Sequence, residues 1–429
     1  MDEAQARDLL FRLRGVTVCG HALLHPAACA LQGLLVLCAE GDPTDAAFTA
    51  AYTRVYAAWL DCVAAGQGGF ADALLDSVVF TPSALATLCS RLPYDQLPYS
   101  VLRAAQHDLT ALGDLAVLEP AAVLALGARV GVSAQALGQL PAWELSPPRD
   151  ARDTRLADIA LRAGSLPALA AFYRCHGTGL VARCPGLTWV GESEDAPTGL
   201  RGISAPDPIR LEDLVLYGDQ RAVLVANTQR LLAGERAANI LLYGDKGTGK
   251  SATVKALLQA YWADGLRIVE VPPARLTDLP LVFALLREQP CGFIVFVDDL
   301  AFAESCLEYT ALKTVLEGGL EARPANAVVY ATSNRRNILR QRFSDRQDDV
   351  SERDTLEEGF SLADRFDLRV TFLAPSQDEY LQIVAALAAS CSIPVTDTLR
   401  ADALAWAVAR GGRSPRAARQ FIQRCEGGR

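Results

Sequence analysis

Residues 239–258 read NILLYGDKGTGKSATVKALL. The apolar run at the start of this stretch predicts a strand, and the apolar periodicity at its end predicts a helix. Between them, residues 244–251 fit the pattern G-x-x-x-x-G-K-[ST], whose glycines allow a tight turn with backbone N–H groups pointing into one concavity that holds phosphate oxygens. The stretch therefore predicts an α/β fold with a phosphate-binding loop. The residues expected to line that loop are Gly244, Asp245, Lys246, Gly247, Thr248, Gly249, Lys250, Ser251 and Ala252.

Two residues of the loop have distinct expected roles. The ammonium group of Lys250 is placed to reach the β- and γ-phosphates of a nucleotide, and the hydroxyl of Ser251 is a ligand for Mg²⁺. The helix that follows adds the positive end of its dipole to the same concavity. The loop therefore predicts a nucleotide and a magnesium ion bound together.

A pair of carboxylates follows about 50 residues later. Residues 292–300, GFIVFVDDL, predict a buried strand that ends in Asp298 and Asp299. Downstream of a phosphate-binding loop, the first acid is expected to help hold Mg²⁺ and the second to orient or polarise the attacking water. The alternative is a pair of solvated turn residues, and the assignment of roles between the two acids is open.

Further strands are predicted at 266–271, 327–334 and 370–375, each separated from the next by helical patterns. Alternating strands and helices imply a mostly parallel sheet covered on both faces. We therefore expect an α/β core over 209–375. The remaining residues, 376–429, return to helical patterns and predict a small helical lid.

The N-terminal part of the chain has a different composition. Residues 1–190 are rich in alanine and leucine at helical spacing, which predicts an all-α domain that could bind a partner. Residues 191–208 are dense in glycine, proline and acids and predict a linker. A short strand around Trp189 is expected to close the helical domain.

Composition narrows the functional classes. The net charge of −9 disfavours a globally basic nucleic-acid binder, although a local basic patch is compatible with it. The 11 scattered cysteines include no CxxC pair, and the first residues are acidic, so a cytoplasmic protein with free thiols is expected. The apolar stretch 21–39 contains two histidines and a proline, which favours a buried helix over a membrane span.

The chain from 209 to 425 resembles the AAA+ ATPases. ATSN at 331–334 is similar to their sensor 1 strand, which implies that Asn334 lies near the γ-phosphate. LADRF at 362–366 is similar to the segment with an arginine finger and implies that role for Arg365. RSPRAARQF at 413–421 resembles the sensor 2 helix, with Arg416 on the nucleotide, and LVLYGDQ at 214–220 occupies the place of the adenine-packing segment, centred on Tyr217 and Gly218.

Each of these assignments has a plainer alternative. Arg365 could pair with a neighbouring aspartate on the surface, Asn334 could be a strand-end turn residue, and Arg413, Arg416 and Arg419 could form a solvated face. Further arginines are open interface candidates: Arg323, Arg335 and Arg336.

A closer resemblance is to an uncharacterised bacterial AAA+ ATP-binding family catalogued as a domain of unknown function. The stretches that carry it are 239–258, 312–339 and 410–421. It implies ATP binding and hydrolysis with Mg²⁺ but no known client. The Asp298–Asp299 pair resembles the initiator and helicase-loader branch, in which the second acid can be aspartate. Many other AAA+ proteins have glutamate at the second position, and the shorter aspartate is compatible with slow hydrolysis.

These observations lead to one main hypothesis and two alternatives. The main one is a cytoplasmic AAA+ ATPase that forms a ring or dimer, takes Arg365 from a neighbour, and remodels or switches an unknown protein partner through its N-terminal domain. The first alternative is an ATP-gated interaction module with little turnover. The second is a helicase-loader-like protein on nucleic acid, which the acidic balance and the lack of an evident helix-turn-helix DNA reader in the lid disfavour. The acidic segment 343–361 is typical of a solvated loop, and it would repel DNA if it faced it. No membrane association is expected.

Overall fold

The structure is a computed structural model that describes residues 1–147, 153–300, 307–317, 323–334 and 364–427. The chain divides into two compact units, Met1–Arg183 and Cys184–Arg429. The predictions for Arg335, Arg336 and the acidic segment 343–361 concern residues outside the described ranges.

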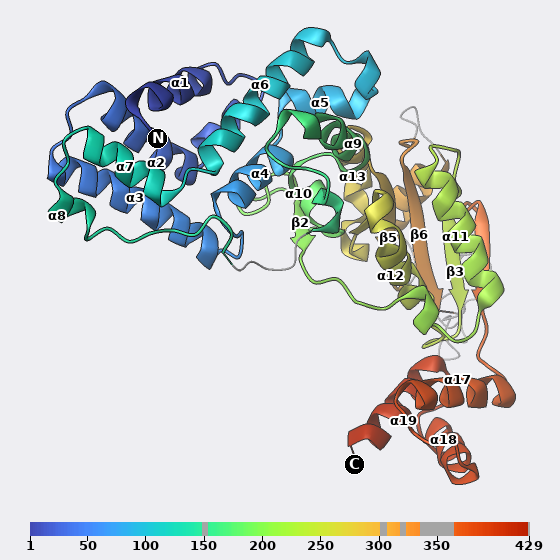
Figure 1. Ribbon diagram of the computed structural model, residues 1–429. Helices are drawn as coiled ribbons and strands as arrows, with labels where there is room; N and C mark the ends of the chain where they lie inside the picture. Colours follow the sequence, from blue (N-terminus) through green and yellow to red (C-terminus); the bar gives the residue numbers. More distant parts are fainter. Residues whose placement is uncertain (148–152, 301–306, 318–322, 335–363, 428–429) are drawn as a thin grey trace. The chain divides into compact units, whose positions relative to one another are not determined.

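The first unit is helical, as predicted (Figure 1). One apolar cluster includes Leu9, Phe48 and Trp143, and a second is built around Leu112 and Phe172. These clusters bury the apolar faces of amphipathic helices, which is what the sequence spacing requires. The α-helices are α1 (Glu3–Arg14), α2 (Pro26–Glu40), α3 (Asp45–Ala64), α4 (Phe70–Phe80), α5 (Ala84–Arg91), α6 (Tyr99–Ala116), α7 (Pro120–Arg129), α8 (Ala134–Leu137), α9 (Leu166–His176) and α10 (Gly179–Arg183).

The apolar stretch 21–39 forms a short 3₁₀ turn followed by α2. Leu31, Leu34 and Leu35 on α2 are buried within the first unit. Among the described residues, no single helix combines the length and apolar character that crossing a membrane requires.

The second unit is an α/β structure around a seven-stranded sheet with the order β2-β1-β4-β5-β6-β3-β7. The pair β1–β2 is antiparallel, and the other neighbours are parallel. This confirms the predicted P-loop fold with a mostly parallel sheet. The strands are β1 (Gly186–Trp189), β2 (Leu200–Ile203), β3 (Ile240–Gly244), β4 (Leu266–Glu270), β5 (Gly292–Val297), β6 (Ala327–Asn334) and β7 (Leu368–Phe372).

Helices cover the sheet on both faces. Every residue of β5 is buried, which explains why its sequence reads as one continuous apolar run. On one face, α11 (Gly218–Leu232) and α12 (Lys250–Tyr261) pack Leu224 and Val254 against alternate residues of the central strands. The remaining core helices are α13 (Leu279–Arg287), which contacts β6, and α14 (Leu307–Glu317).

The region expected to join the two domains differs from the prediction. The strand at Trp189 does not close the helical unit, because β1 pairs in parallel with β4. Residues 200–203, expected within a linker, form β2 at the edge of the same sheet. The sequence shows only short apolar alternation here, and which sheet such a strand joins depends on backbone pairing with β4 far along the chain.

The predicted lid consists of α17 (Gln377–Ser390), α18 (Asp397–Ala409) and α19 (Pro415–Gly427), which Figure 1 shows gathered together. Ser376 and Glu379 form a capping box at the start of α17. Tyr380 and Phe421 belong to the small apolar core of the lid, against which Leu216 packs.

Candidate active site

The phosphate-binding loop connects β3 to α12. Gly244 has φ 141°, and a Cβ atom there would lie 1.9 Å from the carbonyl oxygen of Phe372, so only glycine fits. Gly249, with φ 100°, is the N-cap of α12 and offers no side chain to the first backbone N–H groups of the helix. These N–H groups are therefore available to an anion such as a phosphate.

Lys250 extends from the first turn of α12 under this loop. Its Nζ donates to the carbonyl oxygens of Gly244 (3.0 Å) and Asp245 (2.8 Å) and to Oδ1 of Asn334 (3.1 Å). The residue is only 6% exposed. Burial lowers the pKa of the ammonium group, and the nearby carboxylates of Asp245, Asp299 and Asp298 oppose that shift.

The carboxyl ends of β5 and β6 bring the two acids to the loop. Oδ1 of Asp298 accepts hydrogen bonds from the hydroxyls of Ser251 and Thr332, both at 2.6 Å. Oδ1 of Asp299 accepts from Nδ2 of Asn334 at 2.6 Å, and its backbone N–H donates to Thr332 Oγ1 at 2.9 Å. The hydroxyl of Thr332 therefore links the two acids.

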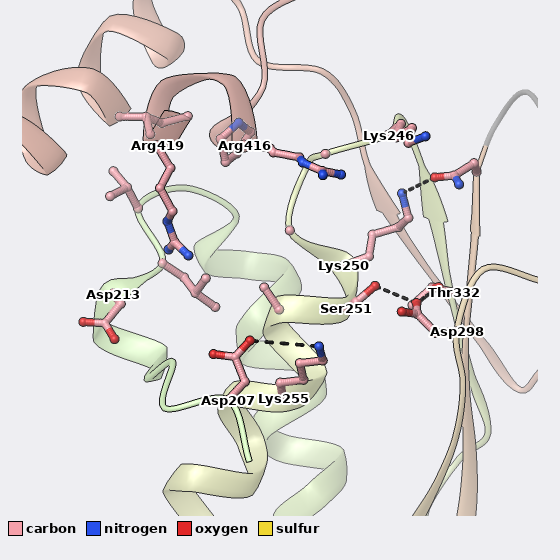
Figure 2. A pocket seen from close by; sticks show the side chains of 18 of the residues that line it. Asp207, Asp213, Lys246, Lys250, Ser251, Lys255, Asp298, Thr332, Arg416 and Arg419 are labelled. Atoms are coloured by element: carbon pink, nitrogen blue, oxygen red, sulfur yellow. Dashed lines mark hydrogen bonds and ion pairs between the residues drawn. The ribbon is translucent and has the colours of Figure 1, made fainter. Parts of the chain in front are cut away.

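These groups line a cavity of about 640 Å³ between the core and the lid (Figure 2). Arg416 and Arg419 extend into it from α19, and the backbone N–H of Arg416 donates to Gly247 O at 3.3 Å. Figure 2 shows Asp213 across the cavity from Asp298, and Leu214, the residue after Asp213, belongs to an apolar wall at that end. The residues of this wall are Leu214, Val215, Ile383 and Leu387.

The donor set fits a magnesium ion. The hydroxyl of Ser251 and the carboxylate of Asp298 are hard oxygen ligands that lie side by side at the loop. Mg²⁺ is commonly bound by one or two such protein oxygens, with water and substrate phosphates completing its coordination. Ser251 and Asp298 are therefore the residues that would hold the ion.

A family model described as "Protein of unknown function (DUF815)" matches residues 183–429, more than half of the chain. The chain belongs to the DUF815 family. This confirms the resemblance to an uncharacterised family. The likeness of the Asp298–Asp299 pair to the initiator branch stays a prediction.

Solved structures similar to this DUF815 protein include the RuvB Holliday junction branch migration motor of Thermotoga maritima. It is 14% identical with a TM-score of 0.35, and the match covers 51% of this chain and 65% of that chain. Two variants of the same protein match at 15% identity with TM-scores of 0.37 and 0.36. The DUF815 chain thus spans less than two thirds of the RuvB chain it matches. No curated protein matches the chain.

Most of the predicted loop residues reach the cavity. Three of the nine do not line it, and each has a supporting contact. The carbonyl of Gly244 accepts from Lys250, the side chain of Asp245 accepts from the Ala374 N–H at 2.9 Å, and the hydroxyl of Thr248 donates to Asp245 O at 2.8 Å. The residues of the loop that line the cavity are Lys246, Gly247, Gly249, Lys250, Ser251 and Ala252.

The role of the adenine-packing segment stays a prediction, and the structure shows which of its residues reach the cavity. Among the described residues that line the cavity, this segment contributes Leu214 and Val215 rather than Tyr217 and Gly218. Tyr217 has φ 64°, which turns its ring onto Phe372 (centroids 5.0 Å apart) and its hydroxyl onto the Leu373 carbonyl (2.6 Å). Burial raises the pKa of Tyr217 to about 12, so the ring is a neutral packing element.

Two of the predicted arginines lie away from the cavity. Arg365 Nε is 3.0 Å from Glu317 Oε1, and the Arg365 side chain is 45% exposed. Arg323 donates to the Asn239 side chain and to the Ala237 carbonyl, so it ties together backbone segments of its own chain.

Sequence reasoning assigned no role to several residues that the fold brings to the site. Thr332 belongs to the segment that resembles the sensor 1 strand, but nothing in the sequence indicates that its hydroxyl contacts the Asp298 carboxylate and the backbone N–H of Asp299. The sequence does not distinguish Arg419 from its neighbouring surface arginines, although its spacing of three from Arg416 places both on one helix face. Asp207 and Lys255, which also line the cavity, carried no sequence signal.

Proposed function

We propose that this protein binds ATP with Mg²⁺ and hydrolyses it to ADP and phosphate. The observation that carries the proposal is the joint placement of Lys250, Ser251 and Asp298 at one end of a cavity whose other end is apolar. A triphosphate and a purine base require those two environments. The AAA+ fold of the DUF815 chain supports the same conclusion.

Each residue has a defined part in the proposed reaction. The loop N–H groups and Lys250 bind the β- and γ-phosphates, and Arg416 approaches them from the lid. When bound, Mg²⁺ neutralises charge on the phosphates, and Ser251 and Asp298 would hold it. Asp299 accepts a hydrogen bond from the attacking water and then its proton, and Asn334 Nδ2, which donates to Asp299 Oδ1 at 2.6 Å, keeps that carboxylate in place.

The arginine finger is proposed to come from a neighbouring copy. Arg365 does not line the cavity of its own chain, and its partner Glu317 is itself partly exposed. A guanidinium group that stabilises the transferred phosphoryl group in trans is a frequent device in P-loop enzymes. A dimer or ring that places Arg365 at a neighbour's γ-phosphate is therefore part of the proposal, and the first unit would engage the protein client.

The direct test is phosphate release by the purified full-length chain over a range of protein concentrations, with and without Mg²⁺. We expect Mg²⁺-dependent turnover whose specific activity rises with protein concentration, because assembly completes the site. Specific activity that stays constant on dilution to monomer would reject the finger in trans. Tight ATP binding without turnover at any concentration would favour the ATP-gated switch.

We expect Thr332→Val to lower kcat about tenfold while changing the KM for ATP little, because Asp298 loses a hydrogen-bond donor and the backbone N–H of Asp299 loses its acceptor. Thr332 is 2% exposed, and valine has nearly the same shape. Steady-state kinetics with ATP measure the effect.

Ser333→Ala is the matched control for this substitution. Ser333 is the adjacent buried hydroxyl, and it donates to Leu300 O at 2.9 Å rather than to either acid. An equal loss of kcat in the two variants would show that Thr332 acts only through the stability of β6.

A further inference from the structure

A second charged pair lies in the cavity, away from the phosphate-binding loop. Lys255 Nζ is 4.0 Å from Asp207 Oδ2, and Figure 2 shows the two side chains facing each other. Both residues line the cavity. Lys255 follows Ser251 by four residues on α12, so the two share one face of the helix, about 5–6 Å apart between Cβ atoms.

The backbone holds Asp207 in place at this point. Its Oδ1 accepts from the N–H of Ile209 at 3.2 Å, and its carbonyl oxygen accepts from Nε2 of Gln259 at 3.0 Å. Gln259 lies one further turn along α12, so the segment that carries Asp207 is tied to the same helix as Lys255. Oδ2 is the carboxylate oxygen left to face Lys255 and the cavity.

The order of groups in the cavity corresponds to the order of groups in a nucleotide. Lys250 and Ser251 define the phosphate end, and the wall that includes Leu214 and Ile383 suits a base. Asp207 faces Lys255, which lies one helical turn beyond Ser251 on α12. Ribose lies between phosphates and base, and its hydroxyls are donors that a carboxylate accepts well. Lys255 has no acceptor capacity, so of this pair only Asp207 can accept a hydrogen bond from a ribose hydroxyl.

We propose that Asp207 is the ribose-binding residue of this site, accepting a hydrogen bond from a ribose hydroxyl of the bound nucleotide. Lys255 is a positioning residue that holds the carboxylate of Asp207 toward the cavity. The inference rests on the proposed nucleotide-binding function and adds a preference for ribonucleotides to it. Both side chains are 48% exposed, so water competes for these hydrogen bonds and the preference is modest.

The test is calorimetric titration of the full-length chain with the magnesium complexes of ATP, 2′-deoxyATP and 3′-deoxyATP. We expect ATP to bind about three- to tenfold more tightly than at least one deoxy analogue. In Asp207→Ala, ATP affinity should fall by that factor while the affinity for that analogue stays unchanged. The unchanged analogue affinity also shows that the variant is folded.

Two further variants complete the experiment. Asp264→Ala removes an exposed carboxylate just beyond α12 and should keep the full preference for ATP. Lys255→Met should reduce the preference for ATP over the deoxy analogue. If Asp207→Ala does not fold, this variant provides the test instead. Equal affinities of the wild type for all three nucleotides, or a preference that survives in Asp207→Ala, would overturn the inference. A wild-type chain that binds none of the three would instead refute the proposed function.

Discussion

We expect Lys250→Ala to bind ATP about ten- to a hundredfold more weakly than the wild type, because a hydrogen bond to a charged group contributes about 1.5–3 kcal/mol. Phosphate release should fall by about 10²- to 10³-fold, as when a preorganised electrostatic contact is removed from a transition state. Lys250 is buried and within hydrogen-bond distance of Asn334, so alanine also leaves Asn334 without this donor. Calorimetry measures the binding, and a phosphate-release assay measures the turnover.

Lys313→Ala is the control for this substitution. Lys313 lies on α14 and is absent from the residues that line the cavity, so its loss removes the same charge from elsewhere in the second unit. Its binding and turnover should match the wild type. Full turnover in Lys250→Ala would mean that the phosphate-binding loop is not the catalytic centre.

The second prediction concerns a mixture of two inactive variants. Arg365→Ala alone should lose about 10³- to 10⁵-fold in turnover, the usual effect of removing an arginine finger. Mixed with Lys250→Ala, it should regain turnover, because the Lys250→Ala copy still supplies Arg365 to a neighbour whose phosphate-binding loop is intact. The measurement is phosphate release at constant total protein over a series of mixing ratios, with a maximum at an intermediate ratio.

Arg369→Ala provides the matched control. Arg369 is an exposed arginine of β7 that pairs with Asp364, so its removal changes the surface charge near Arg365 without touching Arg365 itself. It should remain active alone. A mixture of Arg365→Ala and Lys250→Ala that stays inactive, although the two variants assemble, would place the finger within one chain or remove it from the mechanism.

The strands of the core could be predicted because each reads as a short apolar run. The expected range 327–334 coincides with β6, and the expected range 292–300 contains β5. A strand buried on both faces of a parallel sheet needs apolar residues at nearly every position, so it can be recognised from its own residues alone. The strand expected at 370–375 occupies 368–372 instead, since Leu368 and Arg369 are exposed at the edge of the sheet and carry a weaker apolar signal.

The candidate site was only partly predictable. The loop from Gly244 to Ser251 depends on local backbone geometry, and consecutive residues provide it. The contact between Ser251 and Asp298 joins residues 47 apart, and that between Asp298 and Thr332 joins residues 34 apart. No local pattern indicates that the ends of β5 and β6 lie side by side, so the sequence does not predict the contact between Thr332 and Asp298.

The sequence by itself determined the phosphate-binding loop, the parallel α/β core and the helical character of the N-terminal unit. These follow from glycine conformations, from the continuous apolar runs of the buried strands and from the hydrophobic period of 3.6 residues in the helices, which all act over a few neighbouring positions. Only the tertiary structure decided that β1 joins the sheet, that Tyr217 turns away from the cavity, and that Asp207 meets Lys255. Those outcomes depend on strand pairing and packing between segments that are distant in the sequence. The free energies of these interactions cannot be inferred from any single stretch of sequence.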